Sequence, residues 1–400
     1  MDDATLERLA DLVVRFGANV QPDQIVTISC QPGKEKLTRL VAASAYKAGA
    51  KFVEVTWFDP YIKRARIEFA RDDTLDYVPP WLGERMLALG EERAARIGLS
   101  GPVAPGLMKD LDPVRSGRDR LPGLKESGTV VNERTTNWSI VPCPTPEWAQ
   151  LVFGDLPPEE AEAELDRHLL HILRLDEPDP VAAWRERAQV LERSAQTLTE
   201  RGFDALHYQG PGTDFTVGLL PGARWEAATF ETVGGIEHMA NIPTEEVFTS
   251  PDPQRLEGHV TASKPLVLID GTVVENLHLR FEGGQIVEVR ADTAQDTMRT
   301  IIERNEGASR LGELALVDDE GRIGKLETVY FDTLLDENAA SHIALGNAYG
   351  HVVEAAEDKA RINTSSIHVD FMIGSPELDV DGLTASGDAV PLLRGGAWQV

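Results

Sequence analysis

Near the C-terminus, a histidine and an aspartate are spaced so that they can act together. His368 and Asp370 lie in residues 365–374, where apolar residues alternate with polar ones. This period of two predicts a strand, and residues two apart on a strand point to the same face. An imidazole nitrogen and a carboxylate oxygen at one place suit a divalent metal such as zinc, cobalt or manganese. Taken alone, the pair favours the alternative of a hydrogen bond that only ties one strand to its neighbour.

Two further polar residues stand in apolar surroundings. Glu313 lies in an apolar stretch, residues 311–316, that predicts a strand, and a buried carboxylate there is costly unless it is paired or bound to metal. His342 lies in a stretch rich in Ala and Leu, and we predict a helix from about residue 336 to 349. Tyr349 would then project from the same face of the helix, two turns beyond His342. A salt-bridged glutamate and a core histidine are the structural alternatives.

Two adjacent glutamates, Glu245 and Glu246, precede another apolar run. If the segment is extended, their carboxylates face opposite ways, so only one of them can enter a given site. A loop with two solvated acids is the alternative. Three carboxylates and two imidazoles would match a pair of divalent metals, which activate a water and polarise a carbonyl. This chemistry is that of a hydrolase.

Composition excludes several classes of function. The chain has 400 residues, with 66 acidic and 39 basic residues and a net charge of −27, and no basic block occurs. Such a surface repels nucleic acid and anionic membranes. The sequence shows two cysteines, no signal-like apolar core at the N-terminus and no apolar run near the roughly 20 residues that span a bilayer. We therefore expect a soluble cytoplasmic protein with no nucleic-acid or membrane partner.

Two patterns of predicted secondary structure divide the chain into an α/β part and a mixed α+β part. In the first part, predicted strands at 24–29 and 52–57 alternate with predicted helices at 34–48 and 84–95, which indicates a largely parallel sheet. No phosphate-binding glycine motif follows these strands. Pro-rich breaks place the boundary near residue 185, which predicts an N-terminal α/β domain at 1–185 and a C-terminal catalytic, metal-binding domain at 186–400.

The residue pattern of the second part predicts mainly antiparallel strands. Residues 256–291 predict a meander, in which Gly283-Gly284 gives a hairpin signal. A helix is predicted at 293–304 and a further strand at 329–332.

Several segments resemble the signatures of one family, in the same order along the chain. They are residues 212–219, 241–249, 311–316, 336–342 and 367–375, and they resemble the thermophilic aminopeptidase family, metallopeptidase family twenty-nine. The resemblance implies five ligands for two divalent ions (zinc, cobalt or manganese): Glu246, Glu313, His342, His368 and Asp370. It implies that Glu313 bridges the ions and that Tyr349 is the active-site tyrosine. Glu245 is then a general base or a residue that supports the ligands.

The resemblance also implies a function and an assembly. The family consists of metal-dependent aminopeptidases that form homodimers around a restricted cavity, so short peptides would be the substrates. A ring-cleaving dioxygenase on the same scaffold is the alternative, with one iron held by His342, His368 and Asp370. The additional acids Glu246 and Glu313 argue against it. A non-catalytic protein with a vestigial site is a third possibility, and the intact set of ligands argues against that.

Overall fold

The first half of the chain folds around a small parallel sheet. The computed structural model describes residues 1–119, 122–268 and 271–400. Strands β1 (Ile25–Cys30), β2 (Phe52–Trp57), β3 (Ala95–Ser100) and β4 (Trp138–Pro142) lie in the order β2-β1-β3-β4, and all pairs are parallel. The accompanying helices are α1 (Asp3–Leu12), α2 (Glu35–Lys47), α3 (Pro60–Phe69), α4 (Pro80–Glu91), α5 (Pro113–Arg118), α6 (Leu124–Asn132), α7 (Pro146–Val152) and α8 (Pro158–Ile172). The predicted parallel sheet with alternating helices is confirmed for the N-terminal part, although α4 ends before Ala95, which begins β3.

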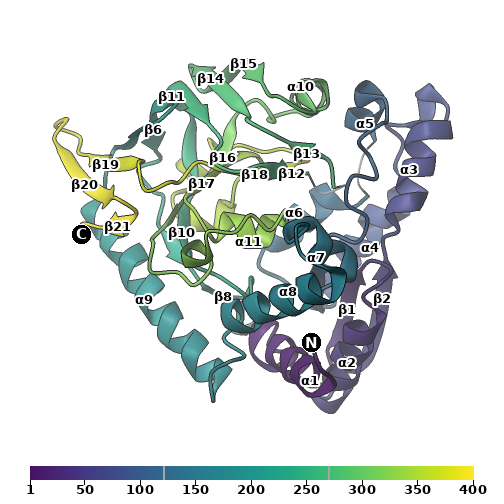
Figure 1. The fold of residues 1–400 in the computed structure, drawn as a ribbon. Helices are drawn as coiled ribbons and strands as arrows, with labels where there is room; N and C mark the ends of the chain where they lie inside the picture. Colours follow the sequence, from purple (N-terminus) through teal and green to yellow (C-terminus); the bar gives the residue numbers. More distant parts are fainter. Residues whose placement is uncertain (120–121, 269–270) are drawn as a thin grey trace.

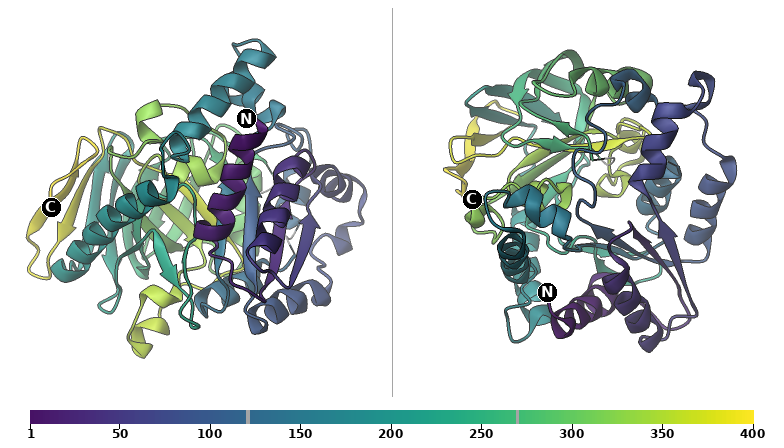
Figure 2. Two further views of the ribbon diagram at one scale, coloured as in Figure 1. Left: turned by 90° about the horizontal axis from the view of Figure 1, so that it is seen from below. Right: turned by 45° about the vertical axis from the view of Figure 1, so that its right-hand side comes forward.

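The second half contains two larger sheets, and Figures 1 and 2 show its strands on the opposite side of the molecule from the N-terminal sheet. The eight-stranded sheet has the order β15-β14-β11-β6-β5-β19-β20-β21 and antiparallel pairs. Its strands are β5 (Ala205–Gly210), β6 (Thr213–Leu219), β11 (Pro251–Thr261), β14 (His278–Glu282), β15 (Gln285–Arg290), β19 (Asp379–Leu383), β20 (Ala389–Arg394) and β21 (Ala397–Trp398). The predicted hairpin at Gly283-Gly284 joins β14 and β15. Residues 269–270 of the predicted meander lie outside the described residues.

The five-stranded sheet carries the candidate site. Its order is β18-β17-β16-β10-β7, again with antiparallel pairs. The strands are β7 (Glu226–Ala227), β10 (Glu246–Thr249), β16 (Leu311–Val317), β17 (His342–Gly346) and β18 (His368–Met372). Every residue of β10, β16 and β17 is buried. Short ribbons β8 (Thr229–Glu231) with β9 (Glu237–Met239), and β12 (Leu266–Val267) with β13 (Val273–Val274), lie outside these sheets, and α10 (Gln295–Arg304) follows β15.

One long helix, α9 (Pro180–Arg201), connects the halves and packs against β7 and β10. The Asp179 side chain caps its first turn, and Gly202 ends it in the left-handed region, which glycine adopts without strain. The predicted boundary at residue 185 falls inside this helix, and one apolar core runs through both halves. The division into two domains stays a prediction.

The predicted helix at 336–349 is wrong. A short helix, α11 (Thr333–Glu337), begins after the Asp332 cap, and His342 then opens strand β17. Because β17 lies between β16 and β18 and is buried on both faces, it shows no alternation of apolar and polar residues. The predicted strand at 329–332 is also wrong, since this segment is a loop that leads into α11.

Within the described residues, no helix combines the length and the apolar character needed to cross a membrane.

Candidate metal centre

Five of the predicted site residues lie on four neighbouring strands. They are Glu246 at the start of β10, Glu313 in β16, His342 at the start of β17, and His368 and Asp370 in β18. Glu246 is in register with Val317, four residues beyond Glu313 on the same strand. Because alternate residues of a strand share a face, Glu246 and Glu313 point to the same side of the sheet.

The strand register places the other three on this face as well. Ala344, two residues after His342, pairs with Glu313 on one side and with Asp370 on the other. Gly346, two residues further on, pairs with His368. The small side chains of Ala344 and Gly346 leave room between the longer ones. The sheet therefore presents a set of nitrogen and oxygen donors around a space that its own residues do not fill.

The backbone fixes the tautomer of both histidines. His342 Nδ1 lies 2.9 Å from the carbonyl oxygen of Glu337, and His368 Nδ1 lies 2.8 Å from that of Asn347. A carbonyl oxygen only accepts hydrogen bonds, so each Nδ1 carries the hydrogen and each Nε2 keeps its lone pair. Metal-binding histidines usually donate a hydrogen bond from one ring nitrogen in this way and bind the metal through the other.

Each lone pair faces carboxylate oxygens. His342 Nε2 is 2.9 Å from Glu246 Oε2, and His368 Nε2 is 2.9 Å from Glu313 Oε2 and 3.1 Å from Asp370 Oδ1. The partner of Glu313 is thus a histidine and not a nearby arginine. Two electron pairs at this distance repel each other unless a proton or a metal ion lies between them.

Buried oxygen atoms without donors support a metal. Glu246 Oε2 and Asp370 Oδ1 are buried, and neither has a hydrogen-bond donor in suitable geometry among the described residues. A carboxylate oxygen left unpaired in a buried site is costly. The donor set of imidazole nitrogens and carboxylate oxygens fits zinc, cobalt or manganese.

The protonation equilibria show how strongly this cluster demands a cation. Burial alone would lower the pKa of His342, but its contact with the Glu246 carboxylate and the nearby acids raise it to about 10. Burial raises the pKa of Glu313 to about 7, against the opposing effect of His368. In the absence of metal, protons on the histidines therefore balance the charge of the acids.

Glu337 is a functional candidate that the sequence did not reveal. It lies at the end of α11, is 9% exposed, and forms a possible metal-binding group with His342 and Asp370. The two other such groups are Glu246–Glu313–His342 and Glu313–His368–Asp370. Glu337 is one polar residue within a run of three at a helix end, and no local pattern distinguishes it from a capping residue.

Tyr349 reaches the site from a loop and not from a helix. It follows β17, and its ring centroid lies 5.2 Å from that of His368. Together with Glu246 and Glu313 it lines a pocket. Burial, and then the charges of Glu313 and Asp370, raise the pKa of Tyr349, so its hydroxyl stays a hydrogen-bond donor at neutral pH.

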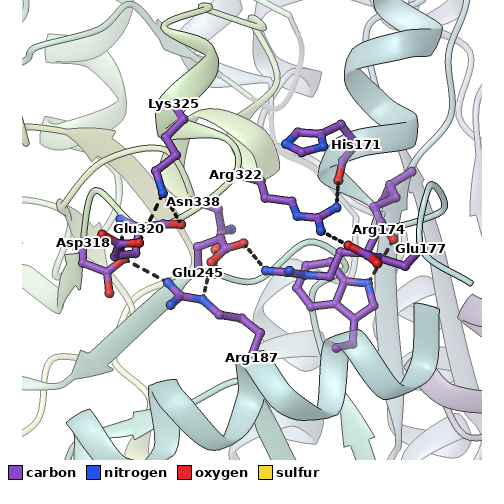
Figure 3. A network of polar contacts seen from close by, with 12 residues as sticks. His171, Arg174, Glu177, Arg187, Glu245, Asp318, Glu320, Arg322, Lys325 and Asn338 are labelled. Atoms are coloured by element: carbon purple, nitrogen blue, oxygen red, sulfur yellow. Dashed lines mark hydrogen bonds and ion pairs between the residues drawn. The ribbon is translucent and has the colours of Figure 1, made fainter. Parts of the chain in front are cut away.

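Glu245 points away from this cluster, as the alternation of an extended segment requires. Its side chain is fully buried, and its carboxylate contacts Arg187 Nε at 2.5 Å and Arg174 Nη2 at 3.2 Å (Figure 3). Arg187 also contacts Asp318, which directly follows β16, at 3.0 Å. The Glu245 backbone N–H donates to Asn338 Oδ1 at 2.7 Å. This network connects the backbone beside Glu246 to the end of β16 and, through Asn338, to the residue after Glu337. A general-base role for Glu245 stays a prediction.

Carboxylates and imidazoles gathered on one buried sheet face are typical of a metal-dependent enzyme. The chain belongs to the thermophilic metalloprotease family (M29), whose model matches residues 2–398. The resemblance in the sequence motifs is thereby confirmed over nearly the whole chain.

Relatives of known activity match along their full length. Aminopeptidase T of Thermus thermophilus is 43% identical over 403 residues, which cover 99% of this chain and 98% of the relative. Aminopeptidase 2 of Geobacillus stearothermophilus is 36% identical over 403 residues, with 98% and 97% covered. The solved structure of wild-type AmpT from Thermus thermophilus superposes with a TM-score of 0.86 at 41% identity and 99% coverage of both chains. This similarity confirms the predicted fold class.

Proposed function

We propose that this protein is an aminopeptidase that removes the N-terminal residue of short peptides with two divalent metal ions. The observation that carries the proposal is the cluster of six donors, five of them on one sheet face and the sixth, Glu337, at the end of α11. Its four carboxylates (Glu246, Glu313, Glu337 and Asp370) carry a formal charge of −4, which two divalent ions with a combined charge of +4 neutralise. The full-length similarity to named aminopeptidases supports the reaction.

The ligands divide into overlapping groups. Glu313 belongs both to the group with Glu246 and His342 and to the group with His368 and Asp370, so we assign its carboxylate to both ions. When bound, such a pair of ions lowers the pKa of a water toward about 7 and polarises the scissile carbonyl. Zinc, cobalt and manganese all suit these ligands.

Residues of the chain itself would position the substrate and stabilise the negative charge that develops on its carbonyl oxygen. The Tyr349 hydroxyl, which lines the pocket beside Glu246 and Glu313, would donate a hydrogen bond to the carbonyl oxygen as negative charge develops there. The free α-amino group of the peptide would dock near one metal ion or one acidic side chain of the cluster. Glu245, held by Arg174 and Arg187, would fix the backbone position of Glu246.

A single-iron dioxygenase is supported less well. His342, His368 and Asp370 would suffice for one iron, but Glu246, Glu313 and Glu337 then stay as three buried acids with no role. The relatives named above are aminopeptidases.

The metal content of protein purified without chelator tests the proposal. Elemental mass spectrometry should give close to two zinc, cobalt or manganese ions per chain, and His368→Ala should lose them. His171→Ala is the matched control, because His171 is an exposed histidine paired with Asp176. Metal-loaded protein should then release N-terminal residues from a peptide panel. One iron per chain would favour the dioxygenase, and no release from any peptide would refute the aminopeptidase.

We also propose a homodimer, because the predicted family forms one and an exposed apolar face is present. Large apolar side chains at the surface concentrate between residues 46 and 87: Tyr46, Phe52, Trp57, Tyr61, Ile62, Phe69, Tyr77, Trp81 and Leu87. Strand β2, at the edge of its sheet, lies in the same stretch. Light scattering should give twice the chain mass of 43.8 kDa, and Ile62→Glu should shift it toward the monomer. A monomer at every concentration would refute the dimer.

A further inference from the structure

An aromatic pocket extends from the metal cluster toward the N-terminal half of the chain. Its described lining has four aromatic residues, Trp138, Phe230, Phe248 and Tyr349, and the two cluster acids Glu246 and Glu313. We propose that Trp138 and Phe230 form a subsite for a bulky apolar side chain on the N-terminal residue of the peptide. This inference rests on the proposed aminopeptidase function and names its substrate class.

The aromatic rings form a continuous series that ends at a metal-ligand candidate. The ring centroids of Trp138 and Phe230 are 6.3 Å apart, those of Phe230 and Phe248 5.8 Å, and those of Phe248 and Tyr349 5.3 Å. Tyr349 in turn lies 5.2 Å from the ring of His368. A carbonyl placed at the cluster would therefore have aromatic surface next to it, within reach of the side chain of the same residue.

Backbone hydrogen bonds fix the position of Trp138 relative to the metal cluster. Trp138 begins β4, the last strand of the N-terminal sheet. Two residues later, the Ile140 N–H donates to Ala240 O at 2.8 Å, and the Ile140 carbonyl accepts from the Ile242 N–H at 3.0 Å. The segment that includes Ala240 and Ile242 continues into Glu246. The N-terminal half therefore supplies part of the pocket, and its position relative to the cluster is set by these hydrogen bonds.

The charges in the pocket favour an apolar occupant. Of the described residues that line it, Glu246 and Glu313 are acidic and none is basic, and bound metal would neutralise those acids. Behind the wall, the buried ring of His238 lies 6.3 Å from Trp138 and 5.9 Å from Phe230. Burial lowers the pKa of His238 to about 4, so it is neutral at pH 7. A charged side chain would lose water here without gaining a partner.

The N-terminal residue is the one that the pocket has to hold. An aminopeptidase binds the end of a chain, while the residues beyond the scissile bond continue away from the site. Phe248 is 3% exposed, and Trp138 and Phe230 are half-buried, so the aromatic side of the pocket offers apolar surface that a side chain of this residue can cover. Contact with aromatic surface of this kind stabilises leucine, methionine or phenylalanine more than alanine.

The selectivity between N-terminal residues tests the subsite. We expect Trp138→Ala to lower the ratio of kcat/KM for a leucine dipeptide to that for an alanine dipeptide by about 10-fold or more, the usual effect of lost apolar contacts in a specificity pocket. Phe230→Ala, which removes the second aromatic ring of the subsite, on β8, should lower the same ratio. Val287→Ala is the control, because Val287 is 46% exposed on β15 and lies outside both the pocket and the proposed dimer surface, and its ratio should equal that of the wild type.

A binding measurement makes the test independent of turnover. Calorimetry of metal-loaded protein with free L-leucine and with glycine should show preference for leucine, and Trp138→Ala should remove most of it. Unchanged ratios and unchanged preference in either folded variant, verified by thermal unfolding, would overturn the subsite. A wild-type protein that cleaves no peptide but still prefers leucine would instead refute the proposed function alone.

Discussion

The two cluster histidines each bind a proton or a metal ion at the same atom. The carbonyl oxygens of Glu337 and Asn347 hold Nδ1 of His342 and His368, so Nε2 is the free position. The pKa of His342, raised to about 10 in the metal-free protein, means that this Nε2 is protonated at neutral pH. Metal uptake must therefore displace protons.

Proton release is the first prediction. At pH 7 we expect metal binding to release at least two protons, one from each histidine and more from Glu313 and Glu337, whose pKa burial raises, so apparent affinity falls as the pH is lowered. Calorimetry in two buffers of different ionisation enthalpy measures this number. His342→Gln should release about one proton fewer. Binding that is independent of pH between 6 and 8 would contradict the displacement.

The same equilibrium sets the stability of the metal-free chain. Because the pKa of His342 in the folded state lies above its ordinary value, its contribution is complete below about pH 6.5 and is lost as the pH rises through about 10. Metal-bound protein has no proton at this nitrogen and should lack that decline.

Glu337 gives the second prediction, at the same scale. We expect Glu337→Gln to weaken metal binding by about 10- to 100-fold, because it removes one of four charges from the cluster. Competition with a chromophoric chelator measures the affinity. Glu303→Gln, on the exposed side of α10, is the control and should bind as the wild type does. Equal affinities of the two variants would show that Glu337 is not a ligand.

At the scale of elements, the sequence predicted the strands whose own residue pattern is distinctive. The alternation at 365–374 correctly placed His368 and Asp370 on one face of β18, and the apolar run at 311–316 correctly gave β16. Strand β17 was missed because it is apolar throughout, and its Ala and Leu content imitates a helix. No local pattern in the sequence marked Trp138 as a pocket residue, because its proposed role depends on the docking of β4 against the segment 240–242. Glu337 likewise becomes a candidate only through the packing of α11 over the sheet.

The ion pairs behind β10 give the third prediction. Removing one partner of a buried ion pair leaves an uncompensated charge, so we expect Glu245→Ala to lower the free energy of unfolding by about 3–5 kcal/mol. Denaturant unfolding measures this value. Glu186→Ala, on the exposed side of α9, should change it by less than about 0.5 kcal/mol.

A second variant at this position, Glu245→Gln, separates two roles of Glu245. If Glu245 positions the ligands, Glu245→Gln weakens both stability and metal affinity. If it is the general base, Glu245→Gln lowers kcat while the metal affinity and the unfolding midpoint stay as in the wild type.

At the scale of the whole molecule, the metal cluster adds to an already large negative charge. The chain carries −27, and three of the four cluster acids lie on the five-stranded sheet, with Glu337 at the end of α11 beside them. Buried charges are screened little by salt, so without metal the cluster depends on bound protons to balance its acids. One of the strands concerned, β10, packs against the long helix α9.

Metal removal should therefore destabilise the whole protein, which is the fourth prediction. Ligand linkage gives a loss of about 2.7 kcal/mol relative to protein held at 100 times the dissociation constant in free metal. Thermal unfolding before and after chelation, with the metal content measured in each sample, should show a lower midpoint that metal restores. His368→Ala, which we expect to lack metal, should respond little to the chelator. An unchanged midpoint in verified metal-free protein would mean that hydrogen bonds and protons alone satisfy the cluster, because four unneutralised acids at this depth would otherwise weaken the sheet that holds them.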